Sequence, residues 1–200
     1  MQRLNEIEEF LLRNWGDVIK IKENAENLQG KVDKLCEEIC KKLQNKDWWS
    51  KEFENPVYKW NDIFFWKKSW HFGRDWLDIV CFSVNAVSPN SLMGHGEDKP
   101  NACIWTKRVT KLGEGKKEKF EERFNVYARE IIKSLPSEIK LTKDPECAFI
   151  YYLPYTPEQW IEILKTGKFV DTILEHFDIL AQFIEPIDKA MAEVLYKKKK

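Results

Sequence analysis

The sequence predicts an α+β fold in which a mainly antiparallel, four-stranded sheet packs with helices. Seven-residue apolar repeats at both ends of the chain indicate a long N-terminal and a long C-terminal helix. Strand-like runs joined by short links in the middle favour antiparallel pairing. We therefore expect a helical arm or coiled-coil segment at residues 1–46. An α+β body should follow at residues 47–200, with its C-terminal helix packed on the arm.

The expected N-terminal helix runs from Leu4 to Leu43, with apolar residues three or four positions apart. This spacing is typical of a coiled-coil seam, and one uninterrupted helix would extend about 60 Å at 1.5 Å per residue. A small body cannot cover such a length. Gly16 weakens the helix, so a break near Gly16 is an alternative, with Asp17 as the cap of a second helix.

Three strand-like runs, rich in aromatic and β-branched residues, follow at residues 62–70, 76–84 and 102–109. A hairpin turn is expected between the first two runs. Residues 88–101 contain two prolines and two glycines, which predicts a long loop between the second and third strands. A short apolar run at residues 147–153 predicts the fourth strand, buried in the sheet.

Three further helices complete the predicted fold. Apolar periodicity indicates a helix at residues 116–135, and Thr156 followed by a proline is typical of the start of a short one. The last predicted helix spans residues 169–196, repeats the heptad spacing and is kinked at Pro186. Because both terminal seams need apolar cover, the first and last helices should pack together, within one chain or between two chains.

Composition narrows the classes of protein. The 33 basic side chains balance 33 acidic ones, and a 43% apolar content is too high for a disordered chain. No run approaches the roughly 18 apolar residues that a membrane span needs, and the N-terminus has no secretory pattern. We therefore expect a cytoplasmic protein with no membrane partner. Its five cysteines form no CxxC pair, which predicts free thiols.

The most distinctive segment, residues 66–76, alternates aromatic and basic side chains and is called the aromatic-basic segment. Such a surface can stack bases or a planar ligand and neutralise phosphates. The alternation also suits a half-buried strand whose aromatic side chains face the core, and both interpretations stay open. The candidate ligand-binding or nucleic-acid-binding residues are Trp66, Lys67, Lys68, Trp70, His71, Arg74, Trp76, Trp105, Lys107 and Arg108.

A second candidate site lies in the long loop, where His95 stands close to Glu97 and Asp98. Histidine beside carboxylates suits proton transfer or metal binding, but no second histidine or cysteine completes a ligand set. We interpret the segment as a polar loop and expect no metal and no cofactor. His176 is expected on a solvated face of the last helix.

A set of residues for metal-dependent nuclease chemistry is incomplete. Such a nuclease needs an acid on one strand and an acid-x-lysine triplet on the next. Asp78 and Lys107 provide the first acid and the lysine, but the second acid is missing. We therefore assign no catalytic residues and lean toward a protein that is not an enzyme.

The layout of the chain nevertheless resembles one family. The heptad helix, the segment WKKSWHFGRDWLDIVCF, the Tyr-x-Pro element at residues 152–154 and the closing helix FVDTILEHFDILAQFIEPIDKAM together carry the resemblance. They are similar to the C-terminal, non-catalytic portion of prokaryotic PD-(D/E)XK nuclease-like proteins of phages and defence systems. The resemblance implies a recognition or regulatory module without its own cleavage activity.

Three functions remain open. The first is a non-enzymatic interaction module that self-associates or binds a protein partner through its heptad helices and presents a Trp-rich surface. The second is a nucleic-acid-binding protein that uses the basic-aromatic strand region. The third is a small-molecule sensor or unrecognised enzyme, with His95, Asp78 and the long loop at its site.

Overall fold

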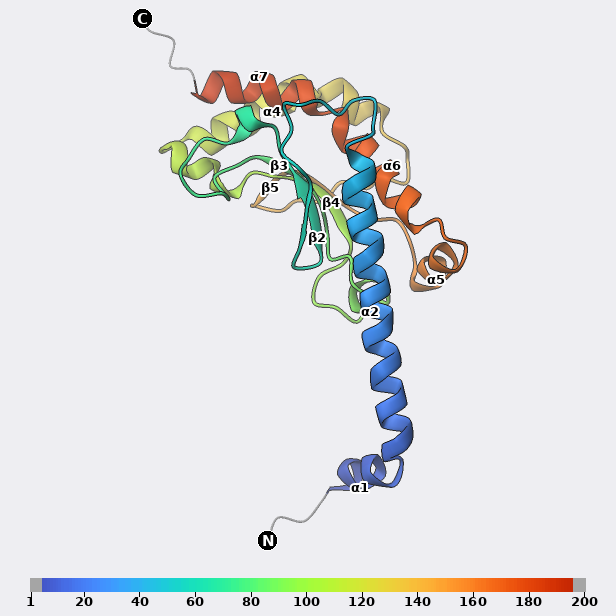
Figure 1. Cartoon of the computed structure of the whole chain (residues 1–200). Helices are drawn as coiled ribbons and strands as arrows, with labels where there is room; N and C mark the ends of the chain where they lie inside the picture. Colours follow the sequence, from blue (N-terminus) through green and yellow to red (C-terminus); the bar gives the residue numbers. More distant parts are fainter. Residues whose placement is uncertain (1–4, 196–200) are drawn as a thin grey trace, which may run out of the picture.

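The computed structural model describes residues 5–195 and contains one antiparallel sheet with helices against it (Figure 1). The strands follow one another across the sheet in the order of the sequence. The α+β class and the antiparallel pairing are therefore confirmed, but the prediction of four strands is wrong, because the sheet has five. They are β1 (Val57–Lys59), β2 (Asp62–Phe65), β3 (Cys81–Asn85), β4 (Asn101–Trp105) and β5 (Cys147–Tyr152).

The additional strand, β1, is too short to show an alternating pattern. It pairs with β2 through a two-residue turn at Trp60 and Asn61, with Lys59 opposite Asp62. Both turn residues have positive φ angles, of 58° and 64°, which is the geometry of a type I′ hairpin turn. Neither residue is glycine, so the usual sequence signal of such a turn is absent.

The other strands are shorter than expected because two of them run into 3₁₀ helices, η1 (Lys68–Trp70) and η2 (Lys107–Leu112). The second predicted strand begins late, at Cys81. The chain before it forms a loop in which the Phe72 N–H donates to the carbonyl of Asp78 at 2.9 Å. Inside the predicted long loop lies a short helix, α3 (Pro89–Leu92).

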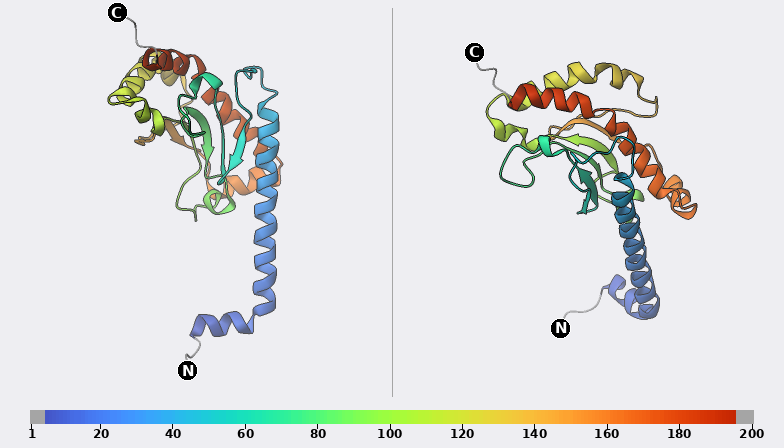
Figure 2. Two further views of the ribbon diagram at one scale, coloured as in Figure 1. Left: turned by 60° about the vertical axis from the view of Figure 1, so that its left-hand side comes forward. Right: turned by 45° about the horizontal axis from the view of Figure 1, so that its top comes forward.

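Of the two alternatives for the first helix, the structure has the one with a break near Gly16. Helix α1 (Glu6–Arg13) and helix α2 (Trp15–Leu43) meet at Asn14, and Figure 2 shows α1 turned aside at the far end of α2. The expected cap is wrong, because Asn14 precedes α2 and Asp17 lies within its first turn. Leu4 and Tyr196, the expected outer ends of the first and last helices, lie outside the described residues.

The last predicted helix is divided into α6 (Phe169–Ala181) and α7 (Ile184–Leu195). The break precedes Pro186, which is accommodated in the first turn of α7, where a missing N–H costs little. The C-terminal half of α2 packs on α6 and β1, so the expected contact between first and last helices holds for α6. Helix α7 packs instead on α4 (Lys116–Ser134), and α5 (Pro157–Lys165) leads into α6.

Helices cover one face of the sheet. Helix α6 crosses β3 and β4, and the strand side chains beneath it alternate with those of the opposite face. Phe65, Phe82, Ile104 and Tyr151 face the helices and are fully buried. The opposite face carries a smaller apolar cluster of Phe64, Ile79 and Cys81. No helix within residues 5–195 is long and apolar enough to cross a membrane.

Two aspartates connect helices α6 and α7 to the rest of the body. Each accepts one hydrogen bond from a lysine and one from a tryptophan. Asp178 on α6 accepts from Lys46 Nζ at 2.7 Å and from Trp48 Nε1 at 2.8 Å. On α7, Asp188 accepts hydrogen bonds from Lys67 and Trp70 in the same way. Charge-assisted hydrogen bonds of this kind are among the stronger ones in proteins.

The expectation of a solvated His176 is wrong. Its side chain is 3% exposed, inside the core between α6 and the sheet, and its Nδ1 lies 2.9 Å from the hydroxyl of Tyr151. The polar neighbours Glu175 and Asp178 suggested a solvated face, but α6 is buried over most of its circumference. Burial lowers the pKa of His176 to about 4.

This burial predicts a loss of stability in acid. The unfolded chain binds a proton at His176 below about pH 6.5, whereas the folded chain resists it until about pH 4. The free energy of unfolding should fall across this interval, by up to about 3 kcal/mol from this residue. Urea denaturation of His176→Gln at pH 7 and pH 4.5 should show a smaller fall than the unmodified protein. His95→Gln, at an exposed loop position, is the control and should show the same fall as the unmodified protein. An equal fall in His176→Gln and His95→Gln would show that His176 does not cause the loss of stability.

Candidate functional site

The aromatic-basic segment divides into a buried part and an exposed part. Trp70 is fully buried and Lys67 nearly so, and both bind Asp188. Lys67 Nζ lies 2.8 Å from Asp188 Oδ2, and Trp70 Nε1 donates to Asp188 Oδ1 at 2.7 Å. Burial by itself lowers the pKa of Lys67, but the carboxylates of Asp188 and Glu52 outweigh it and raise the pKa above its ordinary value. These two predicted binding residues therefore hold α7 against the sheet.

Removal of the Asp188 carboxylate should destabilise the fold, because Lys67 would stay buried and lose its main partner. We expect Asp188→Ala to lower the free energy of unfolding by about 3 kcal/mol, measured by urea denaturation. The matched control is Glu52→Gln, because Glu52 is the exposed partner of the same lysine. It should cost less than about 1 kcal/mol. Equal costs in the two variants would disprove the role of Asp188.

The exposed part of the segment surrounds a shallow hollow of about 320 Å³ beside Glu54. Within it, Lys68 Nζ donates to the carbonyl of Lys51 at 2.9 Å, and His71 Nε2 lies 3.0 Å from the carbonyl of Asp75. The hollow thus gathers half of the residues predicted for ligand or nucleic-acid binding. They are Trp66, Lys68, His71, Arg74 and Trp76.

The remaining predicted residues of this set lie elsewhere. Lys107 and Arg108 are in η2, and Lys107 Nζ pairs with Glu146 at 2.5 Å. Trp105 ends β4 on the face that the helices leave open. Asp78 was expected on a strand beside Lys107; this is wrong, because it lies in the loop before β3 and pairs with Lys111 at 2.5 Å. That hydrogen bond lowers the pKa of Asp78.

Aromatic rings form a row along the edge of the open face, and the row is exposed at Trp60 and Trp76. The ring of Trp60 lies 5.9 Å from that of Trp76, and Phe64 lies 6.1 Å from Trp76 and 6.2 Å from Trp66. Trp60 is 62% and Trp76 is 42% exposed. Lys59 Nζ lies 4.2 Å from the centre of the Trp60 ring, so these ring faces already attract a cation.

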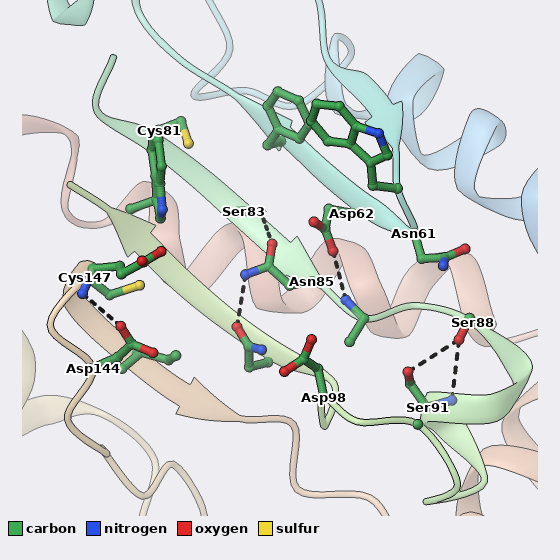
Figure 3. Close-up of a pocket in the computed structure, with 18 of the residues that line it drawn as sticks. Asn61, Asp62, Cys81, Ser83, Asn85, Ser88, Ser91, Asp98, Asp144 and Cys147 are labelled. Atoms are coloured by element: carbon green, nitrogen blue, oxygen red, sulfur yellow. Dashed lines mark hydrogen bonds between the residues drawn. The ribbon is translucent and has the colours of Figure 1, made fainter. Parts of the chain in front are cut away.

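A cavity of about 650 Å³ lies on the face of the sheet that the helices do not cover (Figure 3). The side chains at its base come from β3, β4 and β5, and the segment that contains α3 forms one wall. Of the loop residues singled out in the sequence, Glu97 and Asp98 line this cavity and His95 does not. No sequence pattern marks the other polar residues of the cavity. They are Asn61, Asp62, Ser83, Asn85, Ser88, Asn90, Ser91, Asn101, Asp144 and Glu146.

Hydrogen bonds between neighbouring strands hold the base of the cavity in place. Asn85 Nδ2 donates to Asn101 Oδ1 at 3.0 Å and lies 3.4 Å from Cys103 Sγ. The hydroxyl of Ser83 donates to Asn85 Oδ1. Because these residues alternate with core residues along β3 and β4, the register of the sheet sets their positions.

Asp62 is the most perturbed carboxyl group of the cavity. Its Oδ1 accepts from the N–H of Ala86 at 2.9 Å, and Ala86 holds a positive φ of 59° in doing so. Burial, and secondarily the charge of Asp98, raise the pKa of Asp62 to about 6, although the hydrogen bond from Ala86 opposes them. A carboxyl group with a raised pKa in a cavity is a candidate functional group.

The thiols of the cavity are not activated. Burial raises the pKa of Cys81, and a hydrogen bond with Cys103 together with burial raises that of Cys147. A β-bulge between Ile104 and Trp105 places Cys147 opposite Trp105 and toward the cavity. Protonated thiols are weak nucleophiles and weak metal ligands. Residues 5–195 contain no group of three or more histidine, cysteine or acidic side chains placed to hold a metal ion.

Comparison of the chain with protein-family models, with curated proteins and with solved structures finds no match.

The raised pKa of Asp62 predicts that ionisation of this carboxyl group lowers the free energy of unfolding at pH values above about 6. The unfolded chain loses this proton near pH 3.8 and the folded chain near pH 6, so stability contributed by the protonated form is lost as the pH rises between them. At pH 7, Asp62→Asn should raise the free energy of unfolding by up to about 3 kcal/mol. At pH 3.5 most of the gain should vanish, because Asp62 is then protonated in the folded chain and largely protonated in the unfolded chain.

The amide side chain of this variant keeps an oxygen that can accept from the Ala86 N–H. Glu122→Gln, at an exposed position on α4, is the control and should change little at either pH. The comparison uses urea denaturation at pH 7 and pH 3.5. Absence of any gain at pH 7 would show that the Asp62 carboxylate is better solvated than this geometry implies.

Proposed function

We propose that the protein is a non-enzymatic interaction module that self-associates through its arm, defined as α1 and residues 15–31 of α2. One observation carries the proposal: the apolar seam of α2 continues beyond the body, and nothing within the described residues covers it. Figure 1 makes this projection of α2 visible. Apolar surface of this kind on an otherwise polar helix is typical of a protein-binding face.

The uncovered seam consists of Val18, Ile21, Ala25 and Leu28, and it lies on the same side of α2 as Val32 and Ile39. Val32 and Ile39 are fully buried against the body. Ile21 is 69% and Leu28 is 44% exposed. The apolar seam of α2 is therefore continuous. Its C-terminal part is buried in the core, and its N-terminal part is exposed and can contact a second helix.

A second copy of the arm, running antiparallel, fits this seam. An antiparallel coiled coil pairs a and d positions, which here places Val18 against the partner's Leu28 and Ile21 against the partner's Ala25. In this register Asp17 flanks the seam opposite the partner's Lys31, twice by symmetry. The charges of Asp17 and Lys31 attract each other, whereas Lys22 lies opposite the partner's Lys22 and is repelled by it. The balance of the flanking charges favours association.

The break at Asn14 suits the same register. The first residue of the partner's α2, the partner's Trp15, lies level with Lys31, directly before the seam enters the body at Val32. A straight continuation of the partner's helix would collide with the body there. Helix α1 turns aside at this point, and it carries the exposed apolar residues Ile7 and Phe10.

The test is the oligomeric state of the full chain. Size-exclusion chromatography with light scattering should give a dimer at micromolar concentration, and Ile21→Glu should weaken dimerisation at least about tenfold, because it buries a charge in an apolar seam. Ile19→Glu is the matched control. Ile19 is exposed on the opposite side of α2, so this variant should remain dimeric.

The charge pairs give a second readout for the register. Asp17→Lys should weaken the dimer, and Lys31→Asp in the same chain should restore it. Thermal unfolding followed by circular dichroism should show that the body of each variant remains folded. A monomer at all concentrations, or equal effects of Ile21→Glu and Ile19→Glu, would overturn the proposal.

The resemblance to the non-catalytic portion of PD-(D/E)XK nuclease-like proteins agrees with a module that lacks cleavage activity, and this assignment remains part of the proposal. We also propose a cytoplasmic location, which is supported by five free thiols. Nucleic-acid binding is a second candidate, favoured by the hollow that contains Trp66, Lys68 and Arg74. It is weakened by Lys67 and Lys107, whose charges are occupied by carboxylates.

A further inference from the structure

We propose that the cavity on the open face of the sheet binds a linear aliphatic polyamine, with one terminal amine between Asp62 and Asp98 and the other at Asp144 and Glu146. The inference goes beyond the proposed function, because it uses no residue of the arm. Figure 3 shows Asp62 and Asp98 facing the cavity from opposite walls on one side of Asn85, and Asp144 beside Cys147 on the other side.

The charge of the lining selects a cation. Five carboxylates line the cavity, those of Asp62, Glu97, Asp98, Asp144 and Glu146, and no lysine, arginine or histidine does. Of these five, only Glu146 has an ion-pair partner within residues 5–195, which is Lys107. The field inside a partly enclosed, low-dielectric site of one sign concentrates ligands of the opposite charge.

The middle of the cavity suits methylene groups. Between its two acidic ends lie Phe64 and Ile150, both more than nine-tenths buried on the open face of the sheet, and the buried Cys81 and Ile79 line the end near Asp144. Small-molecule sites in proteins are concave, largely apolar and about 300–1,000 Å³ in size. The observed volume of about 650 Å³ lies within this range.

The length of the ligand follows from the strands. Asp98 precedes β4, which begins at Asn101, and Glu146 lies beyond its other end, where its carbonyl accepts from the N–H of Thr106 at 2.8 Å. Asn101 and Trp105 are four residue steps apart along β4, about 13 Å at 3.3 Å per residue. A short diamine cannot span this distance, whereas a triamine or tetraamine can.

The protonation of Asp62 gives the interaction a pH signature. Burial and the neighbouring Asp98 hold back its ionisation, and the charged groups that face it in the cavity are Asp98 and, when ionised, Cys81. An ammonium group at this position favours the carboxylate form. Binding should therefore release a proton near pH 6 and strengthen as the pH rises from about 5 to about 7.5.

Isothermal titration calorimetry of the full chain with spermidine, at about 150 mM salt and pH 7.5, tests the proposal. We expect one spermidine per chain, with quenching or a shift of the emission of Trp105 and Trp60, which line the cavity. Putrescine and n-butylamine should bind at least about tenfold more weakly, because each reaches only one acidic end. Equal affinity for spermidine and n-butylamine, or no binding at millimolar concentration, would overturn the proposal.

Two substitutions at opposite ends of the cavity separate a specific site from general attraction of cations. Asp62→Asn and Asp144→Asn should each weaken spermidine binding about tenfold, and Glu122→Gln on α4 should not. Asp62→Asn is also expected to fold more stably, so its lost affinity cannot be attributed to unfolding. Binding that is unchanged in Asp62→Asn, or matched by magnesium at equal ionic strength, would refute the site.

Ile21→Glu distinguishes this proposal from that of the arm. This variant should bind spermidine as the unmodified protein does, because Ile21 lies on the arm and outside the cavity. A dimer without polyamine binding would refute only the cavity site, and a polyamine-binding monomer would refute only the self-association.

Discussion

The coverage of the sheet by helices on one face only is the constraint on which the other features depend. Core residues such as Phe82 and Ile104 alternate with residues of the open face, so the register that builds the core also fixes what the open face presents. The cavity, the hydrogen-bonded asparagines and the perturbed carboxyl of Asp62 all lie on this open face. A one-residue slip in β3 or β4 would exchange the two sets of side chains and lose both core and cavity.

Helix α2 illustrates how one sequence pattern serves two purposes. Its heptad stripe is continuous, yet the body covers only the part that begins at Val32. The aspartates at positions 178 and 188 keep that boundary fixed, because each joins a helix to a lysine and a tryptophan from the segment that follows α2. Tryptophans that exceed the needs of a core thus divide into two roles. Trp48 and Trp70 donate to these helix aspartates, while Trp60 and Trp76 remain exposed.

Sequence patterns predicted those features of the fold that depend on residues close to one another in the chain. The helix break, the Thr156 cap and the antiparallel sheet followed from spacing and turn chemistry, and the structure has them. Strand β1 was not predicted because Trp60 and Asn61 adopt left-handed backbone angles without a glycine. The burial of His176 was not predicted because its neighbours in the sequence are polar. The cavity could not be foreseen from periodicity, since Asp62, Asp98 and Asp144 come from separate loops and strands. Only Glu97, Asp98 and Trp105 among the sequence candidates reach it.

The aspartate contacts also bear on how the protein is made. Lys67 and Asp188 are 121 residues apart, and Lys46 and Asp178 are 132 apart. Neither pair can form until Asp178 and Asp188 have left the ribosome, whereas α2 is synthesised well before them and can become helical early. During translation its entire apolar stripe is uncovered, from the arm to Leu43. A nascent chain therefore offers neighbouring chains or chaperones a longer hydrophobic helix than the finished protein does.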